Sequence, residues 1–171
     1  MSSIVVAGDT SGSVTLQAPA VAGSTVLTLP AQTGTVMVNG PAFSAYQSTL
    51  QALPVNTYTK ILFQTEEFDT NNNYDTATSR FTPTVAGYYQ VNACYQITPT
   101  ACQLVCAVYK NGAAYKYGGV STSSLLAHVS AIVFCNGSTD YIEIFTSTTT
   151  AQNSLAGIAT TYFQAAMIRG A

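Results

Sequence analysis

The chain has 171 residues, which is enough for one well-packed domain with an appendage but short for two full domains. Charged residues make up only 7% of the sequence, the net charge is −2 and the five basic residues are dispersed, which disfavours nucleic-acid binding. A surface with so few charges gives poor protection against association. We therefore expect much of it to be buried between subunits, with an uncharged monomer as the alternative.

The N-terminal region, residues 1–40, differs in composition from the rest of the chain. It has no aromatic residue and one charged residue, Asp9, and is built of small and β-branched residues. Two similar phrases, Val14–Pro19 and Val26–Pro30, each resemble a short strand ended by proline. We predict an attachment arm without its own core, whose strands pair with a neighbouring sheet. The residues expected to make the contacts are Val14, Leu16, Val26, Leu27 and Leu29.

Targeting and membrane segments are not visible in the sequence. Residues 1–4 lack the basic start of a secretory signal, and no apolar run approaches the length of a membrane span. We expect folding in a cytosol, no membrane partner and four buried free thiols. One alternative stays open: if residues 98–101 form a hairpin, Cys94 lies nearly opposite Cys106 and within disulfide reach.

In the remaining region, residues 41–171, a strand with clear alternation is first predicted at Tyr58–Phe68. A polar loop follows it. Alternate loop positions carry side-chain oxygens, as in a calcium-binding loop: Asp69, Asn71, Asn73 and Asp75. However, Tyr74 occupies the position that needs glycine, and Arg80 stands where a bidentate glutamate is required. We predict a turn, with a calcium site as the alternative and no other cofactor.

The segment Arg80–Ile97 joins a turn to the longest clean strand pattern. Pro83 cannot donate a ladder hydrogen bond and Gly87 tolerates unusual backbone angles, so a strand is expected to begin at Tyr88. From Tyr89 every second side chain is apolar, which predicts one buried face. That face consists of Tyr89, Val91, Ala93, Tyr95 and Ile97.

The other predicted strands are Leu104–Tyr109, Val129–Cys135, Tyr141–Phe145 and Thr161–Ile168. Hairpin-type turns are predicted at Asn111–Gly112 and Asn136–Gly137. No segment shows a sustained helical period. Short strands at this spacing predict an all-β sandwich or jelly roll.

Catalytic motifs are not recognisable. The single histidine, His128, lacks a recognisable nucleophile and orienting group. A glycosidase would need a pair of carboxylates, but the acidic side chains are expected to be solvated in loops or on outward strand faces. These side chains are Glu66, Glu67, Asp69, Asp75, Asp140 and Glu143. We therefore expect that the protein is not an enzyme.

Aromatic residues are plentiful, with eleven tyrosines, seven phenylalanines and no tryptophan. Because tyrosine is amphipathic, one interpretation is a carbohydrate- or protein-binding surface. We favour packing within the sandwich and around a trimer axis. Tyrosines assigned to that packing are Tyr88, Tyr89, Tyr95, Tyr141 and Tyr162. The predicted core or trimer aromatics are Phe43, Phe68, Tyr74, Phe81, Tyr88, Tyr95 and Phe163.

The pattern Phe81-x-Pro83-x3-Gly87-Tyr88 resembles the signature turn of the complement C1q and tumour-necrosis-factor jelly-roll family. Three other segments resemble the family's opening strand, aromatic loop and a common turn: Pro41–Ala45, Asn73–Asp75 and Lys110–Gly112. The resemblance covers Pro41 to Ala171 and implies a C1q-like, trimeric jelly roll. Two positions depart from the family pattern, because Ser79 and Ala165 stand where glycine is common.

Residues 11–30 and 33–37 resemble N-terminal segments of tailed-phage virion proteins. This resemblance implies a location on the virion surface after synthesis in the host cytoplasm. We predict a homotrimeric capsid decoration or cement protein, whose partners are the major capsid protein or other virion proteins. The short arm favours this interpretation because it leaves no shaft between attachment point and head. The alternatives are a short tail-fibre tip that binds a glycan or protein of the host surface, and a soluble sugar-binding lectin.

Overall fold

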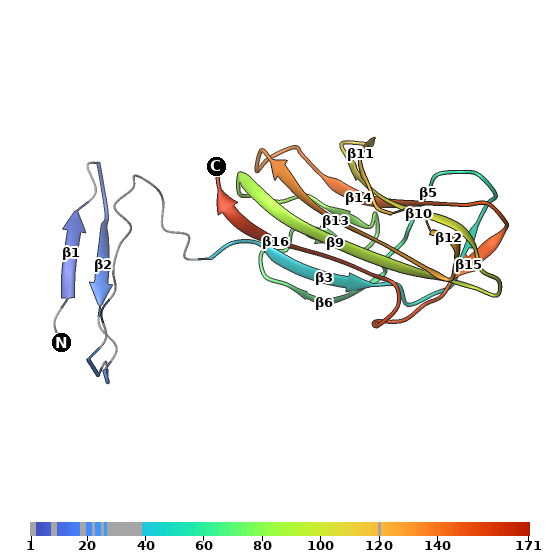
Figure 1. Ribbon diagram of the computed structural model, residues 1–171. Helices are drawn as coiled ribbons and strands as arrows, with labels where there is room; N and C mark the ends of the chain where they lie inside the picture. The colour runs from blue at the N-terminus through green and yellow to red at the C-terminus, as the bar shows by residue number, and fades with distance from the viewer. Residues whose placement is uncertain are drawn as a thin grey trace. The chain divides into compact units, whose positions relative to one another are not determined.

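The structure is a computed structural model that describes residues 3–7, 10–17, 20, 21, 23, 24, 26, 39–119 and 121–171. The chain divides into two compact units, Met1–Gly34 and Thr35–Ala171, near the predicted boundary after residue 40. Every regular element among the described residues is a β-strand (Figure 1), which confirms the all-β prediction. The described part of the chain therefore contains no helix that could span a membrane.

The first unit contains an antiparallel hairpin of β1 (Ser3–Ala7) and β2 (Ser13–Gln17). Strand β2 overlaps the first predicted phrase of the arm, but its backbone is already paired along one edge with β1, a strand that the sequence analysis missed. The second phrase, Val26–Pro30, lies outside the described residues except for Val26, which is exposed.

The second unit is a sandwich of two sheets. One sheet, called here the β9 sheet, is built around β9 (Gly87–Thr98). The same residues of β9 pair with β13 (Leu126–Cys135) and with β16 (Tyr162–Gly170), so these two strands lie on opposite edges of β9. Beyond β16 follow β3 (Ala42–Tyr46) and β6 (Thr65–Asp69), as Figure 1 shows. The short strands β15 (Gln152–Ser154) and β4 (Gln51–Leu53) extend this sheet.

The opposite sheet, called here the β10 sheet, is built around β10 (Cys102–Lys110) and β14 (Ile142–Thr148), which pair along seven residues. β11 (Ala113–Tyr117) and β12 (Ser121–Ser124) pair with β10. β5 (Thr59–Lys60) and β8 (Arg80–Phe81) pair with β14, and β7 (Tyr74–Asp75) pairs with β8.

The hydrophobic core lies between the two sheets. The predicted inner face of β9, from Tyr89 to Ile97, is buried at every second residue, as its alternation predicts. Five of the seven predicted core aromatics are also buried: Phe43, Tyr74, Phe81, Tyr95 and Phe163. The ring centroid of Phe43 lies 4.7 Å from that of Tyr74 and 4.5 Å from that of Phe81. The other two aromatics, Phe68 and Tyr88, lie outside this core, with 52% and 41% of their surfaces exposed.

Two small residues in and beside the signature turn, Gly87 and Ser79, are explained by their surroundings. Gly87 is required by a close approach rather than by unusual backbone angles, since a Cβ there would collide with the carbonyl oxygen of Arg169 and the side chain of Met167. Ser79, which replaces a family glycine, adopts a left-handed backbone with a φ of 51°. Its Oγ accepts a hydrogen bond from the Phe63 backbone N–H at 2.9 Å, which ties this strained position to the core.

Two local predictions are wrong, and one open alternative is excluded. Tyr58–Phe68 is not one strand, because β5 and β6 belong to different sheets and residues 61–64 cross between them. Residues 98–101 do not form a hairpin, because β9 and β10 lie in opposite sheets. Asn136–Gly137 is a turn, but it joins β13 to β14 across the sandwich, whereas Asn111–Gly112 does close the β10–β11 hairpin.

The cysteines follow from the same topology. Cys94 and Cys106 lie on strands of opposite sheets, so they are not cross-strand neighbours. All four cysteines are buried and free, as predicted for a reducing compartment: Cys94, Cys102, Cys106 and Cys135.

Candidate functional site

The N-terminal hairpin presents one wholly aliphatic face. In its register Ile4 lies opposite Leu16, and Val6 lies opposite Val14. Side chains two residues apart on a strand share a face, so these four form one patch, called here the aliphatic hairpin face. Each of the four is 56–66% exposed. The opposite face carries Val5 and Thr15 between small or polar residues.

This face includes Val14 and Leu16, two of the five predicted attachment residues. Val26 is exposed, and Leu27 and Leu29 lie outside the described residues. The sequence analysis missed Ile4 and Val6, although the β-branched run Ile4-Val5-Val6 was a usable strand signal. A two-stranded hairpin is marginally stable alone in water, so a face of this kind gains stability by packing against another surface.

The outer face of the β9 sheet is a second exposed apolar surface. It carries six large apolar side chains with about 40–50% of their surface exposed: Phe68, Tyr88, Leu126, Ile132, Phe134 and Ile168. The rings of Tyr88 and Phe134 lie side by side, with centroids 5.3 Å apart. The strands β3, β9 and β13 contain no Asp, Glu, Lys or Arg. The neighbouring strands do bring charges, since the Glu67 carboxylate on β6 accepts a hydrogen bond from Ser44 and Arg169 on β16 pairs in register with Tyr88. A largely apolar face with few charges is typical of the buried centre of a subunit interface.

A row of polar side chains crosses the same face, and one of its members, Ser44, donates from Oγ to the Glu67 carboxylate. Gln90 Nε2 donates to Ser130 Oγ at 2.9 Å, and Ser130 Oγ donates to Asn92 Oδ1 at 2.9 Å. On β16, Gln164 Nε2 donates to Ser44 Oγ at 3.2 Å. A hollow of about 200 Å³ opens between the two groups, lined by alanines and Phe68 as well as by the polar side chains. The row is already hydrogen-bonded within the subunit, so burying it would cost less than burying unpaired polar groups.

The loop with the calcium-like pattern is held together by its own side chains. Asp69 Oδ2 accepts a hydrogen bond from Tyr74 N at 2.6 Å, and Asp75 Oδ2 accepts one from Thr78 Oγ1 at 2.6 Å. The Thr78 hydroxyl is also the main cause that lowers the pKa of Asp75. The Oδ1 atoms of the asparagines accept bonds from threonine groups within or beside the loop. These contacts are typical of Asx turns, in which short polar side chains bond nearby backbone groups.

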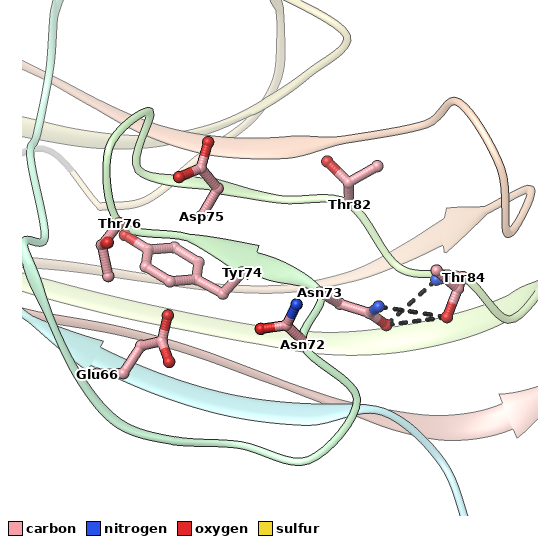
Figure 2. A pocket seen from close by; sticks show the side chains of 8 residues that line it. All are labelled: Glu66, Asn72, Asn73, Tyr74, Asp75, Thr76, Thr82 and Thr84. Carbon is pink, nitrogen blue, oxygen red and sulfur yellow. Dashed lines mark hydrogen bonds between the residues drawn. The ribbon is translucent and has the colours of Figure 1, made fainter.

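A hollow lies beside this loop, and Figure 2 shows the side chains that line it. The hollow has a volume of about 500 Å³. Glu66 and Asp75 come from different strands and flank Tyr74, whose pKa is raised mainly by burial. The Tyr74 hydroxyl donates to the Phe63 carbonyl at 2.9 Å, so its position is fixed from the core side. Within the described ranges, no group of three or more His, Cys, Asp or Glu side chains is arranged to hold a metal ion.

Two carboxylates are not solvated, contrary to the prediction. Glu143 is buried beneath two cations, since its Oε1 lies 3.2 Å from Lys60 Nζ and 3.1 Å from an Arg80 guanidinium nitrogen. Asp140 is buried against Lys110 Nζ, at 2.8 Å. Both are ion-paired because distant strands bring basic residues beside them. His128 is exposed on the outer face of β13, at the register position opposite Cys94.

The fold is similar to solved structures of the C1q and tumour-necrosis-factor type. The globular domain of zebrafish complement 1qA protein matches with a TM-score of 0.57 at 14% identity, over 77% of this chain and 99% of that one. Murine APRIL matches with a TM-score of 0.62 at 7% identity, over 76% of this chain and all of that one. Eiger TNF from S. frugiperda matches with a TM-score of 0.57 at 10% identity, over 77% of this chain and 94% of that one.

No protein-family model matches the sequence, and neither does any curated protein. The structural similarities cover the sandwich and confirm the C1q-like jelly-roll fold that the signature turn predicts. At these identities the similarity establishes the fold alone.

Proposed function

We propose that this protein is a homotrimeric structural protein of a phage virion, and specifically a capsid decoration or cement protein. The N-terminal hairpin attaches the trimer to the major capsid protein or another virion protein, and the jelly-roll heads lie on the virion surface. The observation that carries the proposal is the aliphatic hairpin face. Its four side chains are exposed, and none of the described residues of the chain packs over them.

The proposed trimer rests on the outer face of the β9 sheet. Six large apolar side chains and a pre-bonded polar row provide a surface that association would bury at low desolvation cost. The charge content of 7% favours the same arrangement, because a permanently solvated surface of this size normally carries more charge. The implied homotrimer of the C1q-like resemblance agrees with both arguments.

The attachment step is tested with full-length variants that change one face of β2 at a time. Val14→Asp combined with Leu16→Asp places two charges on the aliphatic hairpin face. Ser13→Asp combined with Thr15→Asp is the matched control, because it adds the same charge to the same strand on the opposite face. Each protein is mixed with particles that lack the native protein and is then sedimented.

We expect the control to co-sediment like the unchanged protein and the Val14/Leu16 variant to stay in the supernatant as a trimer. Equal co-sedimentation of both variants would contradict attachment through the aliphatic hairpin face.

The alternative function is a short tail-fibre tip that binds the host surface. It is favoured by one observation, the gathering of Tyr58, Tyr109 and Tyr117 on the β10 sheet, with the rings of Tyr58 and Tyr117 exposed. Locating the protein on intact particles by electron microscopy distinguishes the two functions, because a cement protein covers the capsid and a fibre tip occupies the tail.

A further inference from the structure

Four aromatic side chains gather on the outer face of the β10 sheet, away from the core. They are Tyr58, just before β5, Tyr109 on β10, Tyr117 on β11 and Phe145 on β14. In the register, both Tyr117 and Phe145 pair with Ala107, so a small residue separates them. We call this group the tyrosine cluster.

The rings of the cluster are in mutual contact. Tyr109 and Phe145 are stacked, with centroids 4.0 Å apart and an interplanar angle of 21°. The Tyr58 ring lies 6.3 Å from that of Tyr109 and 5.9 Å from that of Tyr117. The stacked pair is half-buried, whereas Tyr58 and Tyr117 are 44% and 57% exposed. The cluster is therefore a fixed aromatic platform with two accessible rings.

The hydroxyl groups of this cluster differ from those of the core tyrosines. The hydroxyls of Tyr74 and Tyr89 donate to backbone carbonyls at 2.9 and 2.7 Å, which satisfies them inside the protein. Burial raises the pKa of Tyr58, and the neighbouring Tyr117, which is also its side-chain hydrogen-bond partner, raises it further. Within the described ranges, no hydroxyl of the cluster bonds to the backbone, so all three remain able to bond a ligand.

The cations on β5 and β8 beside the platform are already engaged, while Lys116 on β11 lies over the ring of Tyr115 rather than over the cluster. Lys60, which is paired in register with Phe145, donates from Nζ to Glu143 and to the Thr78 carbonyl. Arg80 also bonds Glu143, and its guanidinium carbon lies 3.8 Å from the Tyr141 ring centroid. These ion pairs hold the cations away from a ligand on the cluster, which favours a neutral ligand over a phosphate, a carboxylate or a charged peptide.

The size of the accessible platform favours a small ligand. An aromatic side chain presents roughly 200 Å² in total, so the exposed parts of Tyr58 and Tyr117 offer roughly 200 Å² together. A stable protein interface buries about 800 Å² on each partner. A sugar ring fits the smaller area, because its C–H-bearing face packs on an aromatic ring while its hydroxyls at the rim bond phenolic oxygens.

We propose that the tyrosine cluster is a carbohydrate-binding site for neutral hexose or N-acetylhexosamine units of an oligosaccharide. The exposed rings of Tyr58 and Tyr117 stack on the sugar, and the three phenolic hydroxyls bond its rim. The site goes beyond the proposed structural role and does not rest on it, because it lies on the sheet opposite the proposed trimer face.

The test uses the full-length protein and an array of neutral oligosaccharides of glucose, galactose, mannose and N-acetylglucosamine, with sulfated and sialylated oligosaccharides as the charged set. The neutral oligosaccharide with the strongest signal is then titrated by calorimetry. Tyr117→Ala removes a ring, Tyr117→Phe removes only its hydroxyl, and Tyr115→Ala is the matched control. Tyr115 lies on the same strand and is also exposed, but has no recorded ring contact with the cluster.

We expect a neutral oligosaccharide to bind, Tyr117→Ala to weaken it at least tenfold, Tyr117→Phe to weaken it less, and Tyr115→Ala to leave it unchanged. Binding confined to the charged set, or no binding by the folded trimer, would overturn the proposal. The proposal would also be overturned if no sugar binds and a host protein binds the trimer through the cluster, with that binding lost in Tyr117→Ala. Particle sedimentation tests attachment separately, so either conclusion can fail without the other.

Discussion

Removing the N-terminal arm separates folding from attachment. A chain that begins at Asn39 keeps the backbone bond from Met167 N to the Pro41 carbonyl at 3.0 Å, and it keeps all of β3. Every member of the buried core cluster lies between Phe43 and Met167. Because no described residue before Phe43 belongs to that cluster, the shortened protein is expected to fold and to form trimers.

The loss of attachment is calculated from the aliphatic hairpin face. Its four side chains are 56–66% exposed, so docking buries the equivalent of about 2.5 further aliphatic side chains. Full burial of such a side chain is worth about 1.5–3 kcal/mol, which gives roughly 4–7 kcal/mol per hairpin before the cost of association. Since 1.4 kcal/mol is a factor of ten, the lower figure corresponds to binding weakened about a thousandfold, and the loss is greater where three hairpins act together.

The measurement has two parts. Circular dichroism, thermal unfolding and light scattering compare the shortened and full-length proteins, and both are expected to give the same fold and three chains per assembly. Sedimentation with particles that lack the native protein then compares attachment. If the shortened protein co-sediments as well as the full chain, the head itself holds the virion and the attachment proposal is refuted. If it fails to fold, the reasoning about the core is refuted instead.

Four other outcomes are expected. Phe43→Ala should lower the free energy of unfolding by about 3–5 kcal/mol in denaturant titrations, because the ring is buried against three others; a loss below about 1 kcal/mol would contradict its core role. Ile132→Asp should convert trimers to monomers in light scattering, and an unchanged trimer would exclude its part of the β9 sheet from the interface. Thiol titration should find four groups after unfolding but slow reaction before it, since burial raises the pKa of buried thiols such as Cys106; two missing groups would indicate a disulfide. The pKa of Asp140 is held below its ordinary value, mainly by the hydrogen bond from the Asn111 amide. The ionised carboxylate therefore stabilises the fold at a pH above its ordinary pKa, and this stabilisation is lost as the pH falls through the lower pKa of the folded state. Asp140→Asn should therefore flatten the acid side of the stability curve, and an unaltered curve would contradict this.

The sandwich was predictable where one strand carries its own pattern. In β9 the alternation from Tyr89 to Ile97 marks the buried face, and the Pro83 and Gly87 signals place the start of the strand within one residue. At Ile61 and Phe63 the alternation correctly indicates burial but wrongly indicates a strand. Both side chains are buried, yet they lie in the connection between β5 and β6. Burial at every second residue needs only an extended chain, and this explains why a crossing between sheets was mistaken for a strand.

Pairing partners were not predictable, because they depend on contacts between distant segments. In this jelly roll, neighbours in sequence such as β9 and β10 lie in opposite sheets, which excludes the open alternative of a hairpin with Cys94 opposite Cys106. Glu143 is buried because Lys60 and Arg80 approach it from strands far away in the sequence. The tyrosine cluster draws its rings from four separate segments and has no local pattern at all.

The two outer faces of the sandwich have different chemistry, and this difference connects the two proposals. The β9 sheet exposes apolar side chains, its strands β3, β9 and β13 contain no Asp, Glu, Lys or Arg, and its polar row is hydrogen-bonded within the subunit. The β10 sheet instead carries an ion-pair cluster around Glu143, and phenolic hydroxyls beside it without backbone partners among the described residues. Burying ion pairs and hydroxyls without backbone partners in a subunit contact is costly, whereas water or a sugar satisfies them readily. Association through the β9 sheet would therefore leave the tyrosine cluster accessible in every subunit of a trimer. Three weak sugar sites on one trimer, repeated over many trimers on one particle, would reach through avidity a strength that a single site of this size does not provide.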